Sequence, residues 1–385
     1  MKRLRVGVVY GGRSGEHEVS LASASAVIAN LDRTRYEPVP IYIERDGRWA
    51  LADRPPSAAR AADVIEHSRL EGARRLSPHR EIHLLARPGV DTVVVVDRRA
   101  EGQPLENAEL TGLALDVVFP VLHGPYGEDG TVQGLFELAN IPYVGAGVLA
   151  SAAGMDKAVM KVLFSAAGLP VVDHLLCWRR DILATLETVV DRVEARFAWP
   201  VFVKPANLGS SVGISKATSR ATLGRALSFA AEFDRKVVVE RGIDRAREIE
   251  CAVLGNDTPD ASVPGEIIPQ RDFYDYEAKY LDDGSRTVIP AALSAEQTTT
   301  VRRLAIDAFR SVDAAGLARV DFLMNPEDDE IFVNEINTMP GFTTISMYSK
   351  LWEASGLPYS HLLDRLIELA LQRQGVKQAL RTTAL

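Results

Sequence analysis

An acid and an amide stand two residues apart at the end of an apolar run near the C-terminal end of the chain. The run begins IFV at residue 331 and continues through Glu335 and Asn337 to a Pro-Gly pair. Because side chains alternate along a strand, Glu335 and Asn337 point the same way. Carboxylate and amide oxygens are the ligands that a hard divalent cation takes. A solvated strand end explains this segment equally well, so by itself it leaves both interpretations open.

A second apolar segment just upstream favours the metal interpretation. Residues 317–324 carry Arg319 and Asp321, and the NPEDD that follows is typical of a turn. An antiparallel hairpin about this turn sets Asp321 opposite Glu335 and Arg319 opposite Asn337, with Cβ atoms about 5 Å apart. Opposed carboxylates repel each other unless a cation such as Mg²⁺ neutralises them. This face therefore predicts a metal site with a fixed positive charge beside it, which suits phosphate chemistry.

The composition of the 385-residue chain is that of an ordinary globular protein with two or three domains. Its net charge of −8 gives no basic footprint for nucleic acid. No apolar run approaches the ~18 residues of a membrane helix, and the N-terminal run stops at Gly11-Gly12, too early for a secretory signal. Cys177 and Cys251 cannot form a disulfide framework, so we expect buried thiols in a reducing compartment.

Strands and helices alternate over residues 1–145, which indicates a parallel sheet covered by helices. Ligands bind such sheets in the loops after the carboxyl ends of the strands, and the loops at 11–20 and 123–131 fit that place. The first loop lacks the G-x-G-x-x-G spacing of a dinucleotide-binding loop. Glu16 in this loop is either a ligand or a helix-start acid, and His123 is either a ligand or a loop histidine without a role.

The block 146–240 holds two features that could contact phosphate. A helix predicted over 155–167 has Lys157 in its first turn, where the helix dipole disfavours a cation unless an anion holds it. A buried strand ends at Lys204, and the following GSSVG (209–213) could wrap phosphate with its hydroxyl and N–H groups. That loop is not a Walker motif, it leads into a strand, and a simple hairpin turn remains its alternative.

The block 241–385 adds a strand over 247–255 that carries Glu248 and Glu250 on one face. The segment 271–286 is aromatic and charged, a composition that suits an ordered active-site loop better than a core strand.

Seven segments in order resemble the D-alanine–D-alanine ligase family of the ATP-grasp superfamily. They are GGRSGEHEVS, LHGPYGEDGTVQG, GMDK, VFVKPANLGSSVGISK, FYDYEAKY, RVDFLM and NEINTMPGFTTISM. The resemblance runs from about residue 5 to about 370, and 50–110 adds little to it. It implies an α/β fold: a Rossmann-like parallel-sheet domain over 1–145, then an ATP-grasp fold of two α+β lobes over 146–240 and 241–385, with ATP held between the lobes.

The activity implied by the resemblance is the joining of two D-alanines through a D-alanyl phosphate, at the expense of ATP. The product serves peptidoglycan synthesis, and so cell wall and cell shape, in the cytoplasm. The resemblance also implies two Mg²⁺ or Mn²⁺ ions, a homodimer, and no nucleic-acid or membrane partner. A D-alanine–D-lactate ligase and a non-catalytic nucleotide sensor on the same fold are the alternatives. Tyr280 at the end of EAKY favours the dipeptide ligase, and the intact set of acids and lysines argues against the sensor.

The matched motifs further imply roles for individual residues. ATP would be bound by Lys157, Lys204, Ser210, Ser211, Glu240, Arg241, Ile243, Glu248, Lys279, Asn334 and Glu335. D-Alanine would be bound by Glu16, His123, Tyr280, Arg319, Gly341, Ser346 and Met347. The metal ligands would be Asp321, Glu335 and Asn337, and the catalytic groups would be Glu16, Ser210, Tyr280, Arg319 and the Gly341 N–H. The spacing between Glu240 and Glu248 is one residue longer than is common in the family. Arg241 stands where the family more often has Lys or Gln.

Overall fold

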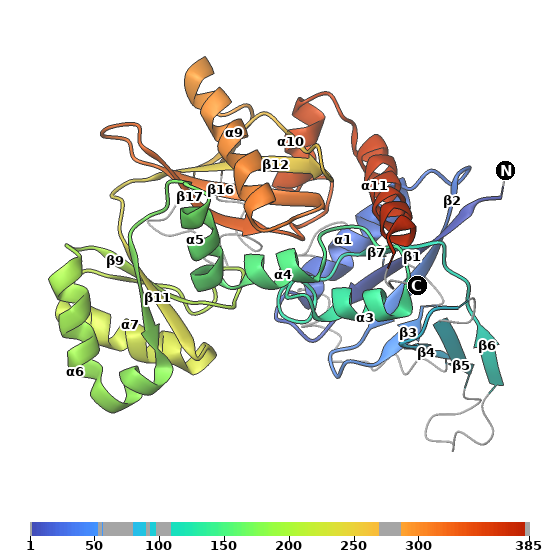
Figure 1. Ribbon diagram of the computed structural model, residues 1–385, viewed down its shortest axis with the longest axis horizontal. Coiled ribbons are helices and arrows are strands. Elements are labelled where there is room, and N and C mark those ends of the chain that lie inside the picture. Colours follow the sequence, from blue (N-terminus) through green and yellow to red (C-terminus); the bar gives the residue numbers. More distant parts are fainter. Residues whose placement is uncertain are drawn as a thin grey trace.

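Three β-sheets with helices on their faces form the described chain (Figure 1). The computed structural model describes residues 2–52, 56, 80–89, 93–97, 109–268 and 286–381. The predicted ligands Lys279 and Tyr280, with nearly all of the expected active-site loop, lie outside these residues. Within these limits no helix combines the length and the apolar character needed to cross a membrane.

The first sheet has the strand order β6-β5-β4-β3-β2-β1-β7. Its strands are β1 (Leu4–Gly11), β2 (Tyr36–Ile43), β3 (Trp49–Leu51), β4 (Arg80–Leu84), β5 (Val93–Asp97), β6 (Glu109–Gly112) and β7 (Val117–Pro120). The predicted parallel pairing is confirmed for β7, β1 and β2. The remaining strands, β3 to β6, extend the sheet through antiparallel pairs, so the sheet is mixed rather than wholly parallel.

Helices from both ends of the chain cover the first sheet (Figure 1). The predicted helices α1 (His17–Asn30) and α3 (Thr131–Ala139) follow β1 and β7. The long C-terminal helix α11 (Tyr359–Ala379) returns to the same sheet, and its buried leucines share one core with β1 and β7. The last helix of the chain therefore completes the core of the first sheet.

The second sheet is antiparallel and has the order β10-β9-β11-β8. Its strands are β8 (His174–Trp178), β9 (Val201–Pro205), β10 (Ser215–Ala217) and β11 (Lys236–Arg241). One face packs on α6 (Arg179–Arg196) and α7 (Arg220–Phe233), which form the lower left part of Figure 1. The loop after β9 leads directly into β10, as the sequence predicted.

The third sheet has the order β15-β14-β12-β16-β17, and β13 pairs with β12. Its strands are β12 (Arg247–Gly255), β13 (Asp260–Ala261), β14 (Gly265–Ile268), β15 (Arg286–Val288), β16 (Gly316–Met324) and β17 (Ile331–Asn337). A core under one face joins this sheet to α4 (Val148–Met155), α5 (Lys157–Ala166) and α9 (Ala295–Ser311). In Figure 1, α4 and α5 run between the first sheet and the other two.

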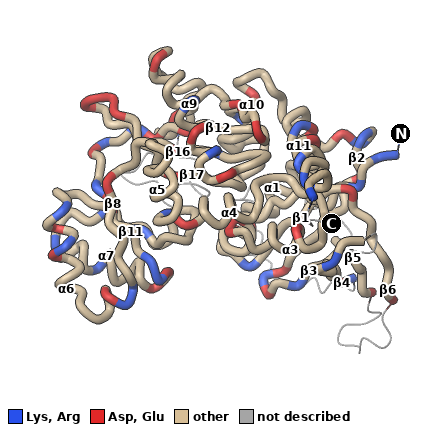
Figure 2. The backbone as a smooth tube through the Cα atoms, viewed as in Figure 1, with Lys and Arg blue, Asp and Glu red and all other residues tan. Residues whose placement is uncertain are grey.

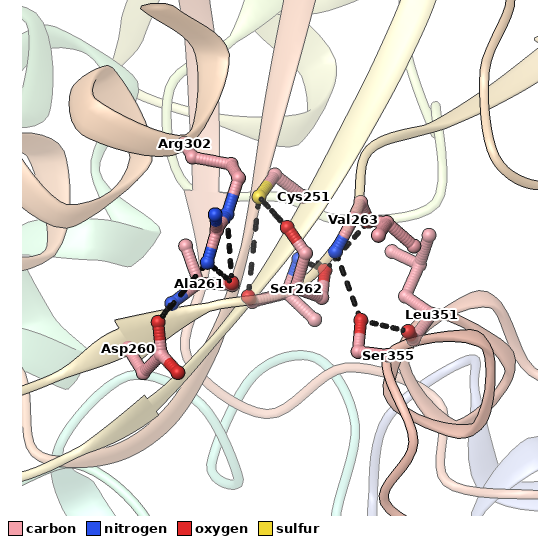
Figure 3. A network of polar contacts seen from close by, with 9 residues as sticks. Cys251, Asp260, Ala261, Ser262, Val263, Arg302, Leu351 and Ser355 are labelled. Carbon is pink, nitrogen blue, oxygen red and sulfur yellow. Dashed lines mark hydrogen bonds and ion pairs between the residues drawn. The ribbon is translucent and has the colours of Figure 1, made fainter. Parts of the chain in front are cut away.

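The face of β12 that points away from the cavity described below is fastened by polar contacts around Cys251 and Ser262 (Figure 3). The Ser262 hydroxyl accepts from the Ala252 N–H at 3.0 Å and lies 3.9 Å from the Cys251 sulfur. Burial raises the pKa of Cys251 to about 12 and that of Cys177 to about 11. Both cysteines are therefore buried, unreactive thiols, as predicted.

The helix predicted over 155–167 is divided by Asp156. This residue has extended backbone angles, so α4 ends at Met155 and α5 begins at Lys157. The Asp156 side chain caps α5 by accepting from the N–H groups of Ala158 and Val159. Lys157 consequently stands at the first position of a helix, where its amine is close to the N-terminal end of the dipole.

The register of the β16–β17 hairpin is confirmed as predicted. Asp321 pairs with Glu335 and Arg319 pairs with Asn337. A bulge follows the Asp321 pair, because Phe322 pairs with Val333 and Asn334 is the extra residue.

Candidate active site

A cavity of about 450 Å³ is lined by residues of the second and third sheets and of the segments that join them. Its apolar walls include Phe202, Ile214, Ile243, Phe322 and Leu323. The structure brings to this cavity eight of the residues implied for ATP: Lys204, Ser211, Glu240, Arg241, Ile243, Glu248, Asn334 and Glu335. A cavity lined by both apolar and charged side chains suits a nucleotide, whose base is planar and whose phosphates are anionic.

Glu240 lies buried at the end of β11 between two lysines. Its carboxylate is 2.9 Å from the Lys161 ammonium and 2.7 Å from the Lys204 ammonium. Burial by itself would raise the pKa of Glu240, but the two cations lower it to about 2. Burial likewise opposes the charge of Lys204, and Glu240 reverses this and raises the pKa of that lysine. Burial lowers the pKa of Lys161, so the ionised pair of this cluster is Glu240 with Lys204.

Asn334, the bulged residue of β17, connects the lysine pair with the hairpin. Its carbonyl oxygen accepts from Lys161 and its side-chain oxygen accepts from Lys204, each at 3.4 Å. A regular strand would have turned these two groups to different neighbours, so the bulge itself aims Asn334 at the lysines.

Lys157 contacts both the phosphate-loop candidate and the hairpin. Its ammonium donates to the Leu208 carbonyl at 2.7 Å and lies 3.6 Å from the Glu335 carboxylate. Its neighbour Asp156 forms an ion pair with Lys236 of β11. The start of α5 is thus fixed to the second sheet on one side and faces the third sheet on the other.

Three carboxylates stand side by side across β12, β16 and β17. Asp321 pairs in register with Glu250 on one side and with Glu335 on the other. The Arg319 guanidinium donates two hydrogen bonds of 2.6 Å to Asp321 and lies 3.1 Å from Glu250. Burial lowers the pKa of Arg319, but these two acids outweigh it and raise that pKa well above its usual value.

This row of acids has the donor chemistry of a divalent cation site. Asp321 and Glu335 supply opposed carboxylates, and the side-chain oxygen of Asn337 is held in place by the Met339 N–H at 2.8 Å. Oxygen ligands of this kind fit Mg²⁺ or Mn²⁺. Because Arg319 occupies both oxygens of Asp321 here, an ion at Asp321 has to share that carboxylate with the arginine.

Glu16, at the start of α1, contacts the serine loop that follows β9. The Ser210 hydroxyl donates to the Glu16 carboxylate across 194 positions of the sequence. Ser210 and Ser211 have φ angles of 49° and 59°, a left-handed conformation that costs a non-glycine residue free energy. A Cβ atom at Gly124, whose φ is 75°, would lie 2.8 Å from the second Glu16 oxygen. Glycine at position 124 is therefore required for the space around the Glu16 carboxylate.

His123 is buried, and both of its ring nitrogens have partners. Nδ1 lies 3.0 Å from the Met339 carbonyl oxygen, and Nε2 lies 3.0 Å from the Ser23 hydroxyl. Burial lowers the pKa of His123, but the neighbouring Glu128 outweighs burial, so that the pKa is raised. Both ring nitrogens thus contact protein groups, and the predicted substrate contact of His123 stays a prediction.

Gly341, Ser346 and Met347 lie together in the segment that follows β17. Ser346 precedes α10 (Met347–Ala354), and its hydroxyl accepts from the Thr343 N–H at 3.0 Å. A Cβ at Gly341 would lie 3.3 Å from that hydroxyl. Asn337, the last residue of β17, pairs with Arg319, so the segment begins beside that arginine.

Comparison with known proteins identifies the family. The D-ala D-ala ligase N-terminus model matches residues 5–146, and the D-ala D-ala ligase C-terminus model matches residues 163–368. This chain belongs to the D-alanine–D-alanine ligase family. The D-alanine–D-alanine ligase of Heliobacterium modesticaldum is 50% identical over 98% of this chain and 97% of its own length. That of Acetivibrio thermocellus is 47% identical over 96% of each chain.

Solved structures agree with this assignment. The D-alanine–D-alanine ligase of Coxiella burnetii is 40% identical and superposes with a TM-score of 0.77, over 98% of this chain and 97% of its own. The VanG D-Ala:D-Ser ligase of Enterococcus faecalis is 34% identical, with a TM-score of 0.80 over 96% and 100%. The predicted ATP-grasp fold is thereby confirmed.

Sequence reasoning missed two charged residues of this ligase-family site. Lys161 is fully buried against Glu240, and Glu250 contacts Arg319. Lys161 stands four positions after Lys157, which places both on one face of α5. Glu250 shares a strand face with Glu248. The helical spacing of the two lysines and the strand spacing of the two glutamates were the sequence signals that could have identified these residues.

Proposed function

We infer that this protein is an ATP-dependent ligase that joins two D-alanines into D-alanyl-D-alanine for peptidoglycan synthesis. The observation that carries this inference is one cavity lined by the buried ion pair of Lys204 with Glu240 and by the row of acids Glu250, Asp321 and Glu335, in a chain of this family. Full-length relatives named D-alanine–D-alanine ligase favour this activity over a depsipeptide ligase or a nucleotide sensor.

We propose that the cavity holds ATP with its base toward Glu240 and its phosphates toward the hairpin. Glu240 accepts from the adenine amino group, Ile243 and Arg241 contact the base, and Glu248 binds the ribose. Lys157, Lys204 and the Ser210–Ser211 loop bind the phosphates, with Lys279 reaching the γ-phosphate. The cationic pair on Glu240 and the short distance of Lys157 from Glu335 support this orientation.

Asp321, Glu335 and Asn337 would hold two Mg²⁺ or Mn²⁺ ions, with Glu335 as a ligand of both, and Asn334 would contact the phosphates. Bound there, the ions supply charge neutralisation for the triphosphate. The support is the opposed pair of carboxylates, which repel each other in the absence of a cation.

We propose that Glu16 binds the ammonium group of the first D-alanine, near His123, and that Ser346 and Met347 contact the second. A carboxylate is a poor acyl donor, so the γ-phosphoryl group is first transferred to an oxygen of the first D-alanine, with release of ADP. The neutral amine of the second D-alanine then attacks the carbonyl carbon, the carbon–oxygen bond to phosphate breaks, and the amine loses its proton. Arg319 and the Gly341 N–H stabilise the oxyanion, an arrangement in which each donor contributes about 10²–10³ in rate.

Water must be kept from the acyl phosphate, which would otherwise hydrolyse. The Ser210 loop is held over the site by Glu16, and we propose that Tyr280 adds a second bond to Glu16 and Ser210. We further propose a cytoplasmic homodimer, with domain boundaries near residues 145 and 240.

ADP release tests the activity. The purified protein with ATP and Mg²⁺ should release ADP when D-alanine is added, and mass spectrometry should find D-alanyl-D-alanine. L-Alanine, D-lactate or no addition should give only background. Equal stimulation by the two alanine enantiomers would contradict the assignment, because each substrate is held at both its amine and its carboxylate.

A further inference from the structure

A turn-like segment after β17 is held by side chains of the first sheet's domain rather than by its own backbone. In a closed four-residue turn the first carbonyl accepts from the fourth N–H. The equivalent groups here are the Met339 carbonyl and the Phe342 N–H. The carbonyl lies 3.0 Å from Nδ1 of His123, and the N–H donates to the Ser23 hydroxyl at 3.1 Å. The Ser23 hydroxyl and His123 Nε2 are 3.0 Å apart and close the circuit.

The Met339 carbonyl and the Phe342 N–H determine which groups donate and which accept in the hydrogen bonds they make. A carbonyl oxygen only accepts, so Nδ1 of His123 carries the hydrogen that Met339 receives. The Phe342 N–H only donates, so the Ser23 oxygen accepts from it. With the neutral ring, the Ser23 hydroxyl donates to Nε2, and with the protonated ring Nε2 donates to the Ser23 oxygen. In both states Ser23 joins the histidine to the far end of the turn.

Water cannot take the place of these bonds. Ser23 is 0% exposed, Phe342 2% and His123 3%. A buried N–H that loses its partner keeps the full cost of desolvation, so the segment would have to move to satisfy it. The Phe342 side chain and carbonyl have separate anchors: the ring packs on Phe119, and the carbonyl accepts from Tyr359. Removing the Ser23 hydroxyl should thus release the N–H end of the turn without unfolding the region.

Gly341 lies between the two clamped residues. We propose that Ser23, acting together with His123, is a positioning residue that fixes the Met339–Phe342 turn and so aims the Gly341 N–H at the carbonyl oxygen during peptide-bond formation. This inference rests on the proposed function, in which Gly341 stabilises the oxyanion. The inference gives His123 a second task, which is to hold the turn through the Met339 carbonyl. It gives Ser23 its first, because the proposed function assigned that residue no role.

A matched control lies one helical turn away. Ser20 is also on α1 and 0% exposed, and its hydroxyl likewise bridges two backbone groups, accepting from Gly11 at 2.8 Å and donating to Val121 at 2.5 Å. Neither group belongs to the Met339–Phe342 turn. Ser20→Ala therefore reproduces the loss of a buried bridging hydroxyl in α1 while leaving the clamp intact.

The experiment compares ADP released with dipeptide formed at saturating ATP and D-alanine. We expect Ser23→Ala to form dipeptide about tenfold more slowly, the scale of one lost hydrogen bond. ADP per dipeptide should rise from one to about two or more, because an acyl phosphate that waits meets water. Ser20→Ala should keep one ADP per dipeptide. Should Ser23→Ala not fold, Ser23→Cys, with its weak donor, should give a smaller rise in the same ratio.

A ratio of one in both Ser23 variants, whatever their rates, would overturn the inference, as would an equal rise in Ser20→Ala. A parent protein that releases no ADP with D-alanine would instead overturn the proposed function, and the inference with it. Parallel losses of ADP release and dipeptide in Ser23→Ala would show a purely structural role and would also overturn the positioning role.

Discussion

The β16–β17 hairpin and the region around Glu16 and His123 are built in different ways. The hairpin collects its charged groups from within 19 residues of sequence, and a single register brings them together. The other region joins groups that are 100 to 319 residues apart, mostly through hydrogen bonds of neutral groups to the backbone. A charge arrangement can thus be specified locally, whereas the space and orientation for a small substrate depend on contacts between domains.

If the hairpin is the centre of charge neutralisation, Glu335→Gln should have the largest effect. The fold should be retained, since an amide is nearly isosteric with a carboxylate. Ligase activity should fall about 10³-fold or more at ordinary Mg²⁺. Steady-state ADP release measures this, and Glu330→Gln at an exposed position of the same hairpin is the control. Near-normal turnover of Glu335→Gln would remove the hairpin from the chemistry.

Gly124→Ala probes the space required in the second region. Its Cβ would come within 2.8 Å of a Glu16 oxygen, at a φ angle of 75° that alanine tolerates poorly. We expect kcat/KM for D-alanine to fall about 10²-fold, the scale of a 1 Å misplacement, while KM for ATP changes little. Gly134→Ala is a matched control, because no atom lies within 4 Å of its added Cβ. An unchanged kcat/KM in Gly124→Ala would show that Glu16 does not contact substrate.

Glu240→Gln tests the ionised end of the cavity. Removing one partner of a buried ion pair costs about 3 kcal/mol, and here two lysines lose it. Because the pKa of Glu240 is lowered to about 2, its contribution to stability is present above about pH 4 and is lost as the pH falls toward 2. The difference in Tm between parent and variant should therefore shrink over that range. Glu187→Gln, which removes an exposed ion pair, should leave Tm unchanged. A pH-independent difference for Glu240→Gln would contradict the charge assignment.

Tyr280→Phe should have the smallest effect on rate and the most specific effect on product. It removes one hydrogen bond, a loss of about 0.5–1.5 kcal/mol. A hydroxy acid carries no ammonium proton and competes best at low pH, so the variant should form D-alanyl-D-lactate near pH 6, where the parent forms almost none. Mass spectrometry with both acceptors from pH 6 to 9 measures this. Identical product ratios in the two proteins would refute the role of Tyr280 but not the ligase activity.

The sequence predicted best what a local period determines. Alternation along two strands and one turn placed Asp321 opposite Glu335, and helical spacing placed Lys157 in the first turn of α5. Figure 2 shows that Lys and Arg are interspersed with Asp and Glu along the described chain. Such predictions need no knowledge of the rest of the fold.

Other features could not be predicted because their causes are tertiary. Lys161 looks like a surface residue of an amphipathic helix until β11 brings Glu240 to it. Ser23 reads as a small residue on a packed helix face, and its hydroxyl gains partners only through the approach of Phe342 and His123, which are distant in the sequence. The antiparallel strands β3 to β6 come from a stretch without clear hydrophobic periodicity, so no sequence pattern predicted their pairing.

The return of α11 to the first sheet determines when that sheet can be finished during synthesis. Leu362, Leu363, Leu366 and Ile367 are fully buried in the core that also contains Val6 and Val8. At ribosomal speeds of about 5–20 residues per second, roughly 20 to 70 seconds separate the two ends of this core. The nascent first sheet therefore waits with an apolar face uncovered until almost the whole chain has been made. The domain that emerges first is completed last, which exposes it to chaperones and to aggregation for most of its translation.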